Sequence, residues 1–156
     1  RPINQSDNKP LSVILREVLI EMQIPKMGSA YEDPEIDDMF KAYQLPRSKY
    51  FVVEKSGEIL GGAGISPLKE GGVNICELQK MYFHKSLRGR GIGQKMIHIC
   101  IDFAIKSNFE KCYIETMPNM IKAQKLYLKK GFKYIDGPLG NTGHNACPVW
   151  MLKKIR

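Results

Sequence analysis

A glycine- and arginine-rich hexapeptide, Arg88 to Gly93, separates an extended segment from an amphipathic one, and no other feature constrains the fold as strongly. The residues before it, 74–83, predict a long strand. The residues after it repeat apolar side chains every three or four positions as far as Asn108, which predicts a helix of about four turns. Where a strand turns into a helix through glycines, backbone N–H groups converge and favour an anion.

The arginines of the hexapeptide indicate which kind of anion the turn would bind. Arg88 and Arg90 add charge beside the amides, which suits a pyrophosphate better than a single phosphate. The spacing G-x-G-x-G follows antiparallel-looking strands and does not fit the Rossmann fingerprint, and the P-loop pattern is absent. From these six residues alone, an anion site and a glycine-rich turn with incidental arginines both remain open.

Periodicity, turns and caps predict the rest of the chain. The expected elements are helices at 11–22, 33–43 and 120–130, a hairpin of strands 49–55 and 59–65, and strands at 111–116, 132–134 and 149–153. Asp7 is the expected N-cap of the first helix, and Gly131 the residue that ends the last. Three antiparallel strands followed by alternating helices and strands predict an α/β (α+β mixed) fold in one domain, residues 1–156.

The amino-acid composition limits the cellular locations and cofactors that we expect. No apolar run approaches the roughly 18 to 20 residues that span a bilayer, and the start of the chain lacks the apolar core of a signal peptide, so we expect a cytoplasmic protein without a membrane partner. The four cysteines form no CxxC pair, which favours reduced thiols and no metal. A homodimer is compatible with these observations.

The net charge of +8 indicates an anionic partner, and both a nucleic acid and a polyphosphate cofactor qualify. Four lysines on one predicted helix, Lys122, Lys125, Lys129 and Lys130, are compatible with a nucleic acid. However, the chain has no aromatic-rich RNA-binding pattern, helix-turn-helix signature or zinc spacing. A nucleic-acid partner is therefore disfavoured.

Two blocks of sequence give the chain a family resemblance. The run Glu77-Leu78-Gln79-Lys80-Met81-Tyr82-Phe83, followed by Leu87-Arg88-Gly89-Arg90-Gly91-Ile92-Gly93, resembles the GNAT superfamily of N-acetyltransferases. The family motif [Q/R]-x-x-G-x-[G/A] is matched by Arg88, Gly91 and Gly93. A second block, from Ala123 to Phe132, looks like the family's A-x-x-L-Y-x-x-x-G-F. The resemblance covers 49–134 well and the N-terminal helices loosely.

The resemblance implies a fold and a cosubstrate. The fold is a single GNAT-like domain with a central, mixed and mostly antiparallel sheet of six to seven strands, splayed between strands 4 and 5 and flanked by about four helices. Acetyl-CoA would bind in the splay, with its pantetheine arm on the backbone of the fourth strand. The implied cofactor-binding residues are Met81, Tyr82, Phe83, Arg88, Gly89, Arg90, Gly91, Ile92, Gly93, Gln94 and Asn119. The family often has Asn seven residues before its tyrosine, where this chain has Met120 beside Asn119.

The chemistry requires a base and an acid. A free alkylamine has a pKa of ~10.4, so a base or a desolvating pocket must remove its proton before it attacks a thioester. Glu77 matches a position that serves as base in many relatives, with a strand carboxylate in a salt bridge as its alternative role, and Glu115 is the second candidate. Tyr127 matches the family's general acid, which would protonate the leaving thiolate, and packing is its alternative.

Two further features complete the expected site. A β-bulge near Met81 would free a backbone N–H for the developing oxyanion. His144 and Cys147 lie three residues apart in a polar loop before the last strand, which favours substrate contact or packing over a nucleophile pair.

The sequence thus predicts an acyltransferase that moves an acetyl group from acetyl-CoA to a primary amine of a small molecule or peptide. The alternatives are a sensor that binds acyl-CoA without turnover and a basic nucleic-acid-binding module. The sequence does not identify the acceptor.

Overall fold

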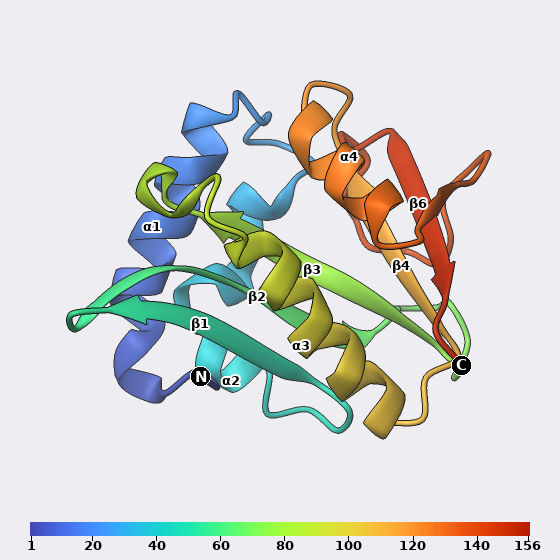
Figure 1. Cartoon of the computed structure of the whole chain (residues 1–156), viewed down its shortest axis with the longest axis horizontal. Coiled ribbons are helices and arrows are strands. Elements are labelled where there is room, and N and C mark those ends of the chain that lie inside the picture. Colours follow the sequence, from blue (N-terminus) through green and yellow to red (C-terminus); the bar gives the residue numbers. More distant parts are fainter.

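The computed structural model describes residues 1–156, and its centre is one sheet with the strand order β1-β2-β3-β4-β6-β5 (Figure 1). The strands are β1 (Lys49–Lys55), β2 (Glu58–Pro67), β3 (Ile75–Phe83), β4 (Lys111–Thr116), β5 (Lys133–Tyr134) and β6 (Val149–Lys154). The α-helices are α1 (Asn8–Glu21), α2 (Met39–Ala42), α3 (Ile92–Lys106) and α4 (Ile121–Lys129), and 3-10 turns occupy Gln5–Asp7, Ala30–Glu32, Pro34–Asp37 and Lys85–Leu87.

Strand pairing makes the sheet mixed and mostly antiparallel, as expected. Only β3 and β4 run parallel, and every other neighbouring pair is antiparallel. Before β1, the chain touches the sheet at one isolated bridge, Pro2 with Phe51, in place of a further strand. The sheet therefore has six strands, and the splay expected between strands 4 and 5 lies between β3 and β4.

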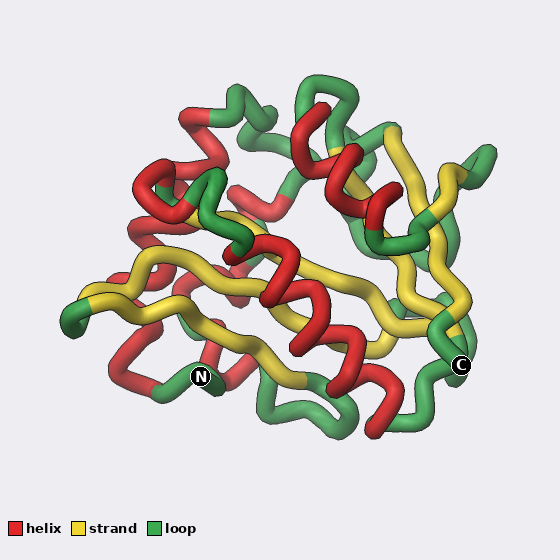
Figure 2. The backbone as a smooth tube through the Cα atoms, in the orientation of Figure 1, coloured by secondary structure: helices red, strands yellow, loops and turns green.

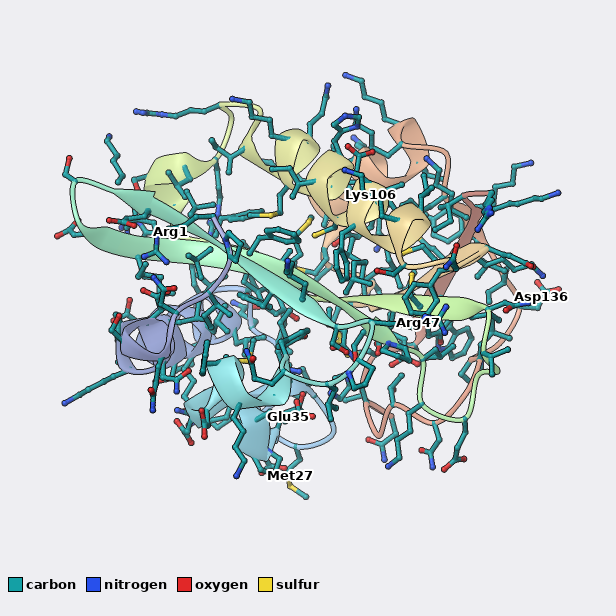
Figure 3. The ribbon with its side chains drawn as sticks, turned by 90° about the horizontal axis from the view of Figure 1, so that it is seen from below. Arg1, Met27, Glu35, Arg47, Lys106 and Asp136 are labelled. Atoms are coloured by element: carbon teal, nitrogen blue, oxygen red, sulfur yellow. The ribbon has the colours of Figure 1, made fainter.

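Each face of the sheet carries its own apolar core. The α1/α2 face is packed by α1, α2 and the segment between them, with Leu11, Leu15 and Met39 fully buried. The α3/α4 face is packed by α3 and α4, with Cys100 and Ile97 at its centre. Figure 3 shows the sheet close to edge-on, with Glu35 on the α1/α2 side and Lys106 of α3 on the other. Both helical layers follow from the amphipathic periodicity of α1 and α3.

The splay arises because β3 remains paired with β2 and β4 remains paired with β6 after the two strands stop pairing with each other. The two strands pair at three positions, the last being Glu77 opposite Tyr113. Beyond this pair, β3 stays with β2 as far as Phe83, while β4 stays with β6 as far as Thr116. Figures 1 and 2 show the two strands adjacent at one end and diverging towards the other. The separation creates room at the middle of the sheet without breaking either ladder.

A β-bulge lies in β3 just where one was expected near Met81. Gly62 is opposite Tyr82 and Gly64 is opposite Gln79, so two residues, Lys80 and Met81, face Ala63 alone. Lys80 has a φ of +48°, a conformation that side chains other than glycine rarely adopt. A bulge leaves one residue out of the ladder and shifts the alternation of side chains by one. Lys80 can therefore turn to the α1/α2 face.

Two local predictions need correction. The helix expected at 33–43 is two short pieces, because Asp38 has a φ of −139° and its carboxylate accepts a hydrogen bond from the N–H of Lys41, which begins α2 anew. Asp7 occupies the N-cap position of α1, as predicted, but its side chain makes no capping hydrogen bond to that helix. That carboxylate instead accepts from the Asn4 N–H at 2.7 Å and pairs with Arg1 at 2.8 Å.

The four cysteines are all free thiols, as expected. Burial raises the pKa of the Cys100 thiol to about 12 and that of Cys147 to about 11, so both stay protonated near neutral pH. No helix is long and apolar enough to span a lipid bilayer.

Candidate active site

A cavity of about 800 Å³ opens at the splay, and we call it the splay cavity. Its walls come from the end of β3, the turn before α3, the last turn of α1 and the first turns of α4. The lining residues are Val18, Met22, Met81, Tyr82, Phe83, Leu87, Arg88, Gly89, Gly91, Ile92, Gly93, Gln94, Asn119, Met120, Ile121, Lys122, Ala123, Lys125 and Leu126. A cavity of this size can enclose an extended cosubstrate arm.

The glycines of the hexapeptide keep one end of the splay cavity open. Gly89 and Gly91 have φ of +73° and +74°, and no atom lies within 4 Å of a Cβ built on either. Gly91 also occupies the N-cap of α3, so the free N–H groups of the first helical turn face this space. Gly93 differs, because a Cβ there would meet Cδ2 of Leu126 at 3.0 Å. The first two glycines are required by backbone conformation and the third by the close approach of α4.

The arginines beside the glycines divide into two roles. The Arg88 guanidinium forms a paired contact with the Glu21 carboxylate at 2.8 and 2.7 Å and donates to the Phe83 carbonyl at 3.1 Å. It thereby fastens the end of α1 to the turn. Arg90 does not line the cavity, whereas Lys122 and Lys125 of α4 do. Sequence reasoning missed these two lysines as lining residues, because only the fold brings that face of α4 to the splay.

The other predicted cofactor-binding residues meet at the same cavity. Met81, Tyr82 and Phe83 form one wall, and Ile92 and Gln94 lie at the start of α3. Asn119 lies opposite, and its side-chain amide donates to the Met22 carbonyl at 2.9 Å. That donor is engaged in holding α1 against the start of α4. Val18 and Met22 were not predicted, because the apolar face of α1 gives no sign of which part of it meets the splay.

Tyr127 lies in the core of the α3/α4 face, next to the cavity but not in its lining. Its ring packs edge-to-face against Phe132 with the ring centres 6.0 Å apart. The side chain is largely buried, and burial raises the pKa of the phenol. Its hydroxyl makes no hydrogen bond within the chain, while the preceding residues Ala123 and Leu126 do line the cavity. The phenol is thus a protonated donor without a partner.

Glu77 lies on the opposite face, at the last β3–β4 pair. Its side chain is 5% exposed, and one carboxylate oxygen accepts from the Gln79 amide at 2.6 Å. Gln79 in turn accepts from the Tyr43 hydroxyl at 2.6 Å. Burial, reinforced by the charge of Glu115 and opposed by the Gln79 hydrogen bond, raises the pKa of Glu77 to about 7. A carboxyl group poised near neutrality suits proton transfer.

The splay brings Glu115 and His144 to Glu77, and we call these three residues the Glu77 cluster. One carboxylate oxygen from each glutamate and one imidazole nitrogen of His144 all lie within 4.8 Å of one another. Glu115 accepts from the Tyr113 hydroxyl at 2.7 Å and from the Thr142 hydroxyl at 2.6 Å. Both carboxylates considered as bases thus share one site with His144, for which the sequence favoured substrate contact or packing.

Two further charged residues border the cluster and were missed by sequence reasoning. Lys80 is buried and its ammonium lies 3.0 Å from carboxylate oxygens of both Asp33 and Glu35. Asp33 also lies 3.0 Å from Nε2 of His144. Burial opposes the charge of His144, but the hydrogen bond and charge of Asp33 outweigh it and raise the pKa of the imidazole. A lysine in the interior of a strand expected to lie in the sheet was a signal that a carboxylate lies opposite.

The idea of a Cys147–His144 nucleophile pair receives no support from the geometry. The two residues are joined through the backbone, where the Cys147 N–H donates to the His144 carbonyl at 3.0 Å. The imidazole is bonded to Asp33, and no hydrogen bond reaches the Cys147 sulfur. A thiol with a pKa of about 11 is a weak nucleophile near neutral pH.

The chain is similar in sequence to known proteins, and this similarity identifies its family. Residues 16–132 match the family model described as the acetyltransferase (GNAT) family. The chain belongs to the GNAT family. The uncharacterized N-acetyltransferase YjgM of Escherichia coli K12 is 38% identical over 156 residues, covering 99% of this chain and 93% of the relative. This GNAT protein is accordingly an acyltransferase, and the predicted family is confirmed.

Solved GNAT structures share the architecture at low sequence identity. An acetyltransferase of the family from Staphylococcus aureus superimposes with a TM-score of 0.87 and 20% identity, covering 100% of this chain and 98% of that one. YncA from Salmonella typhimurium, solved with its cofactor acetyl-CoA, gives a TM-score of 0.79 and 16% identity, covering 100% and 92%. These likenesses establish the GNAT fold, including the six-stranded sheet described above.

Proposed function

We propose that this GNAT protein transfers an acetyl group from acetyl-CoA directly to a primary amine, with the splay cavity as the cosubstrate site. The observation that carries the proposal is that the splay cavity and the Glu77 cluster both lie where β3 and β4 part. The glycine turn and the end of β3 line the splay cavity, and the Glu77 cluster lies at the last β3–β4 pair. Direct transfer requires donor and acceptor to meet at such a junction.

The residues present suit acetyl-CoA. The N-terminal turn of α3 and the open backbone at Gly89 and Gly91 suit a pyrophosphate, and Lys122 and Lys125 add positive charge to the same cavity. The backbone at Met81 to Phe83 borders the space where a pantetheine arm would lie. The relative solved with acetyl-CoA is consistent with this cosubstrate. Arg90, outside the cavity, would contribute only to the surrounding field.

Glu77 is the proposed base and Tyr127 the proposed acid. Glu77 removes a proton from the acceptor ammonium, and its raised pKa of about 7 makes the exchange of that proton possible near neutral pH. The amine then attacks the thioester carbonyl, whose developing charge is within reach of the bulge backbone at Lys80 and Met81. Tyr127 donates its proton to the departing thiolate, which is consistent with a hydroxyl that has no other partner. As the thioester C–S bond breaks and the amide C–N bond forms, the second proton leaves the attacking nitrogen and restores the Tyr127 hydroxyl.

An amine library screened with thiol detection tests the proposal. We expect CoA release that requires an amine and saturates with acetyl-CoA. Binding of acetyl-CoA without release in the presence of any amine would favour the sensor alternative. Salt-sensitive retention on DNA, combined with no thermal stabilisation by acetyl-CoA, would favour the nucleic-acid module.

A further inference from the structure

The Glu77 cluster contains two carboxylates that are hydrogen-bonded only by neutral groups. Glu115 is bonded by two hydroxyls, those of Tyr113 and Thr142. Glu77 is bonded by the Gln79 amide alone, through one oxygen. Neither residue forms a salt bridge with a lysine or an arginine of the chain. Two carboxylates this close repel each other unless a proton or a cation lies between them.

One oxygen of Glu77 is open to a ligand. Its second carboxylate oxygen has no donor in the chain, and no fully buried side-chain oxygen or nitrogen of the protein lacks a partner. This oxygen therefore keeps some accessible surface, although the residue as a whole is only 5% exposed. The Gln79 amide, itself fixed by the Tyr43 hydroxyl, holds the side chain in place through the other oxygen and leaves this one without a donor.

The nearby cations are already engaged. The Lys80 ammonium pairs with Asp33 and Glu35, and the His144 imidazole is bonded to Asp33. Around the cluster, four carboxyl groups, Asp33, Glu35, Glu77 and Glu115, thus face one lysine and one histidine. This local excess of negative charge contrasts with a chain whose net charge is +8. The acceptor side of the splay therefore favours binding of a cation and disfavours binding of an anion.

The spacing of the cluster fits an ammonium group. Charge-assisted N–H···O contacts of about 2.8 Å that diverge at a tetrahedral angle of about 109° place their two acceptors about 4.6 Å apart. One oxygen of Glu77 and one of Glu115 lie no more than 4.8 Å apart, an upper limit that is compatible with this arrangement. A primary ammonium could therefore donate one hydrogen to each carboxylate and keep its substituent pointing out of the cluster.

We propose that the acceptor is a cationic amine that carries no carboxylate or phosphate near its reacting nitrogen, and that Glu115 selects it by binding the ammonium jointly with Glu77. This inference rests on the proposed function and names its substrate class. An anionic group on the acceptor meets Glu77, Glu115 and Asp33, whereas a second ammonium on the acceptor is stabilised by the same carboxylates. The preferred acceptors are accordingly diamines or larger polyamino compounds.

Three amines of equal chain length test this selectivity with the full chain. Thiol release is measured with 1,4-diaminobutane, butylamine and 4-aminobutanoate, which differ only in the charge at the far end. We expect kcat/KM to fall in that order, with at least a tenfold difference between the diamine and the amino acid. Equal rates for the diamine and 4-aminobutanoate would overturn the proposal.

Variants assign the selectivity to the cluster. Glu115→Gln should reduce the ratio between the diamine and the amino acid towards one, with the KM for acetyl-CoA unchanged. Glu17→Gln is the matched control, because Glu17 is exposed on α1 outside the cluster and the substitution changes the charge equally. Selectivity that survives in Glu115→Gln, or that is lost equally in Glu17→Gln, would contradict the assignment.

A binding measurement covers the case in which none of the three amines is acetylated. The diamine should then raise the Tm of the CoA-bound protein more than 4-aminobutanoate does, and Glu115→Gln should remove the difference. No difference in wild type would sink the cationic-acceptor proposal, whereas failure of acetyl-CoA to bind would sink the proposed function instead. A diamine effect that EDTA abolishes, with bound metal found by elemental analysis, would assign the cluster to a divalent cation and overturn the inference.

Discussion

Glu77 of β3 lies opposite Tyr113 of β4, and this is the last pair before the two strands separate. The position explains the character of both residues. Glu77 is buried because the ladder still holds it, yet one of its oxygens has no donor in the chain and keeps some accessible surface. Tyr113 donates to Glu115, two residues farther along the diverging strand. A proton acceptor is thus fixed at the apex of the splay, on the face opposite Tyr127.

Gly91→Glu should abolish binding of acetyl-CoA, because it places bulk and a negative charge at the glycine turn that lines the splay cavity. Gly57→Glu is the matched control. Both glycines have positive φ, +74° and +82°, with no atom within 4 Å of a Cβ, so both variants carry a similar backbone strain. Only Gly91 lines the splay cavity. Calorimetry that finds unchanged affinity in Gly91→Glu, or equal loss in Gly57→Glu, would contradict the proposal that the splay cavity is the cosubstrate site.

Tyr127→Phe should lower kcat by roughly tenfold to a thousandfold while the KM for acetyl-CoA stays nearly constant, since the hydroxyl acts only in the transition state. The ring contact with Phe132 is retained in this variant. Tyr134→Phe removes a hydroxyl that bonds Gln124 near the surface and serves as the control. Steady-state kinetics with an unchanged kcat in Tyr127→Phe would reduce Tyr127 to a packing role.

The pH profile should reveal Glu77. As a base it must be deprotonated, so kcat/KM for the amine should rise with pH through about 7, and this limb should vanish in Glu77→Gln. A rising limb at the same position in the variant would exclude Glu77 as its source.

Stability gives an independent measure of the same group. The folded chain holds the Glu77 proton more tightly than the unfolded chain, so the free energy of unfolding falls as pH rises from 4.5 to about 7. At about 1.4 kcal/mol per pKa unit, the shift from 4.5 to about 7 corresponds to roughly 3 kcal/mol. Glu77→Gln should therefore raise the stability relative to wild type at pH 8 more than at pH 4.5. Urea denaturation at both pH values measures the difference, and an equal effect at both would contradict the raised pKa.

Arg47 should contribute to the stability of the fold and not to cosubstrate binding. Its guanidinium donates to the carbonyls of Val73 and Ser107, each at 2.8 Å, and lies 3.7 Å from the centre of the Phe109 ring. Arg47→Lys cannot reproduce this planar fork, so we expect a loss of about 1 to 3 kcal/mol in the free energy of unfolding. The affinity for acetyl-CoA should not change. Denaturation that leaves the stability intact would show that these contacts contribute little.

The sequence predicted the parts of this fold that depend on local pattern. Strand 111–116 and the helix after Gly91 follow directly from periodicity and glycine conformation. The sequence could not place His144 beside Glu77, because that contact joins a loop to a strand 67 positions away and depends on the splay. The break at Asp38 was missed because one side-chain cap outweighed a continuous helical pattern.

The lysines of α4 also show the difference between what a local pattern predicts and what depends on the tertiary fold. Their common helical face was evident in the sequence, and it suggested a nucleic-acid surface. The fold directs Lys122 and Lys125 to the splay cavity, where they serve a small anion equally well. A local pattern of charged residues indicates the sign of the charge on a binding partner, whereas the tertiary arrangement of those residues decides how large that partner can be.

Transfer of a labelled acetyl group tests the central claim most directly. Acetyl-CoA carrying a ¹³C-labelled acetyl group is incubated with the protein and the best amine from the library, and both products are quantified by mass spectrometry. The account predicts labelled N-acetyl amine and free CoA in equal amounts, with neither formed when acetyl-CoA binding is blocked by Gly91→Glu. Release of CoA without labelled amide, or no turnover with any amine despite tight binding of acetyl-CoA, would contradict it.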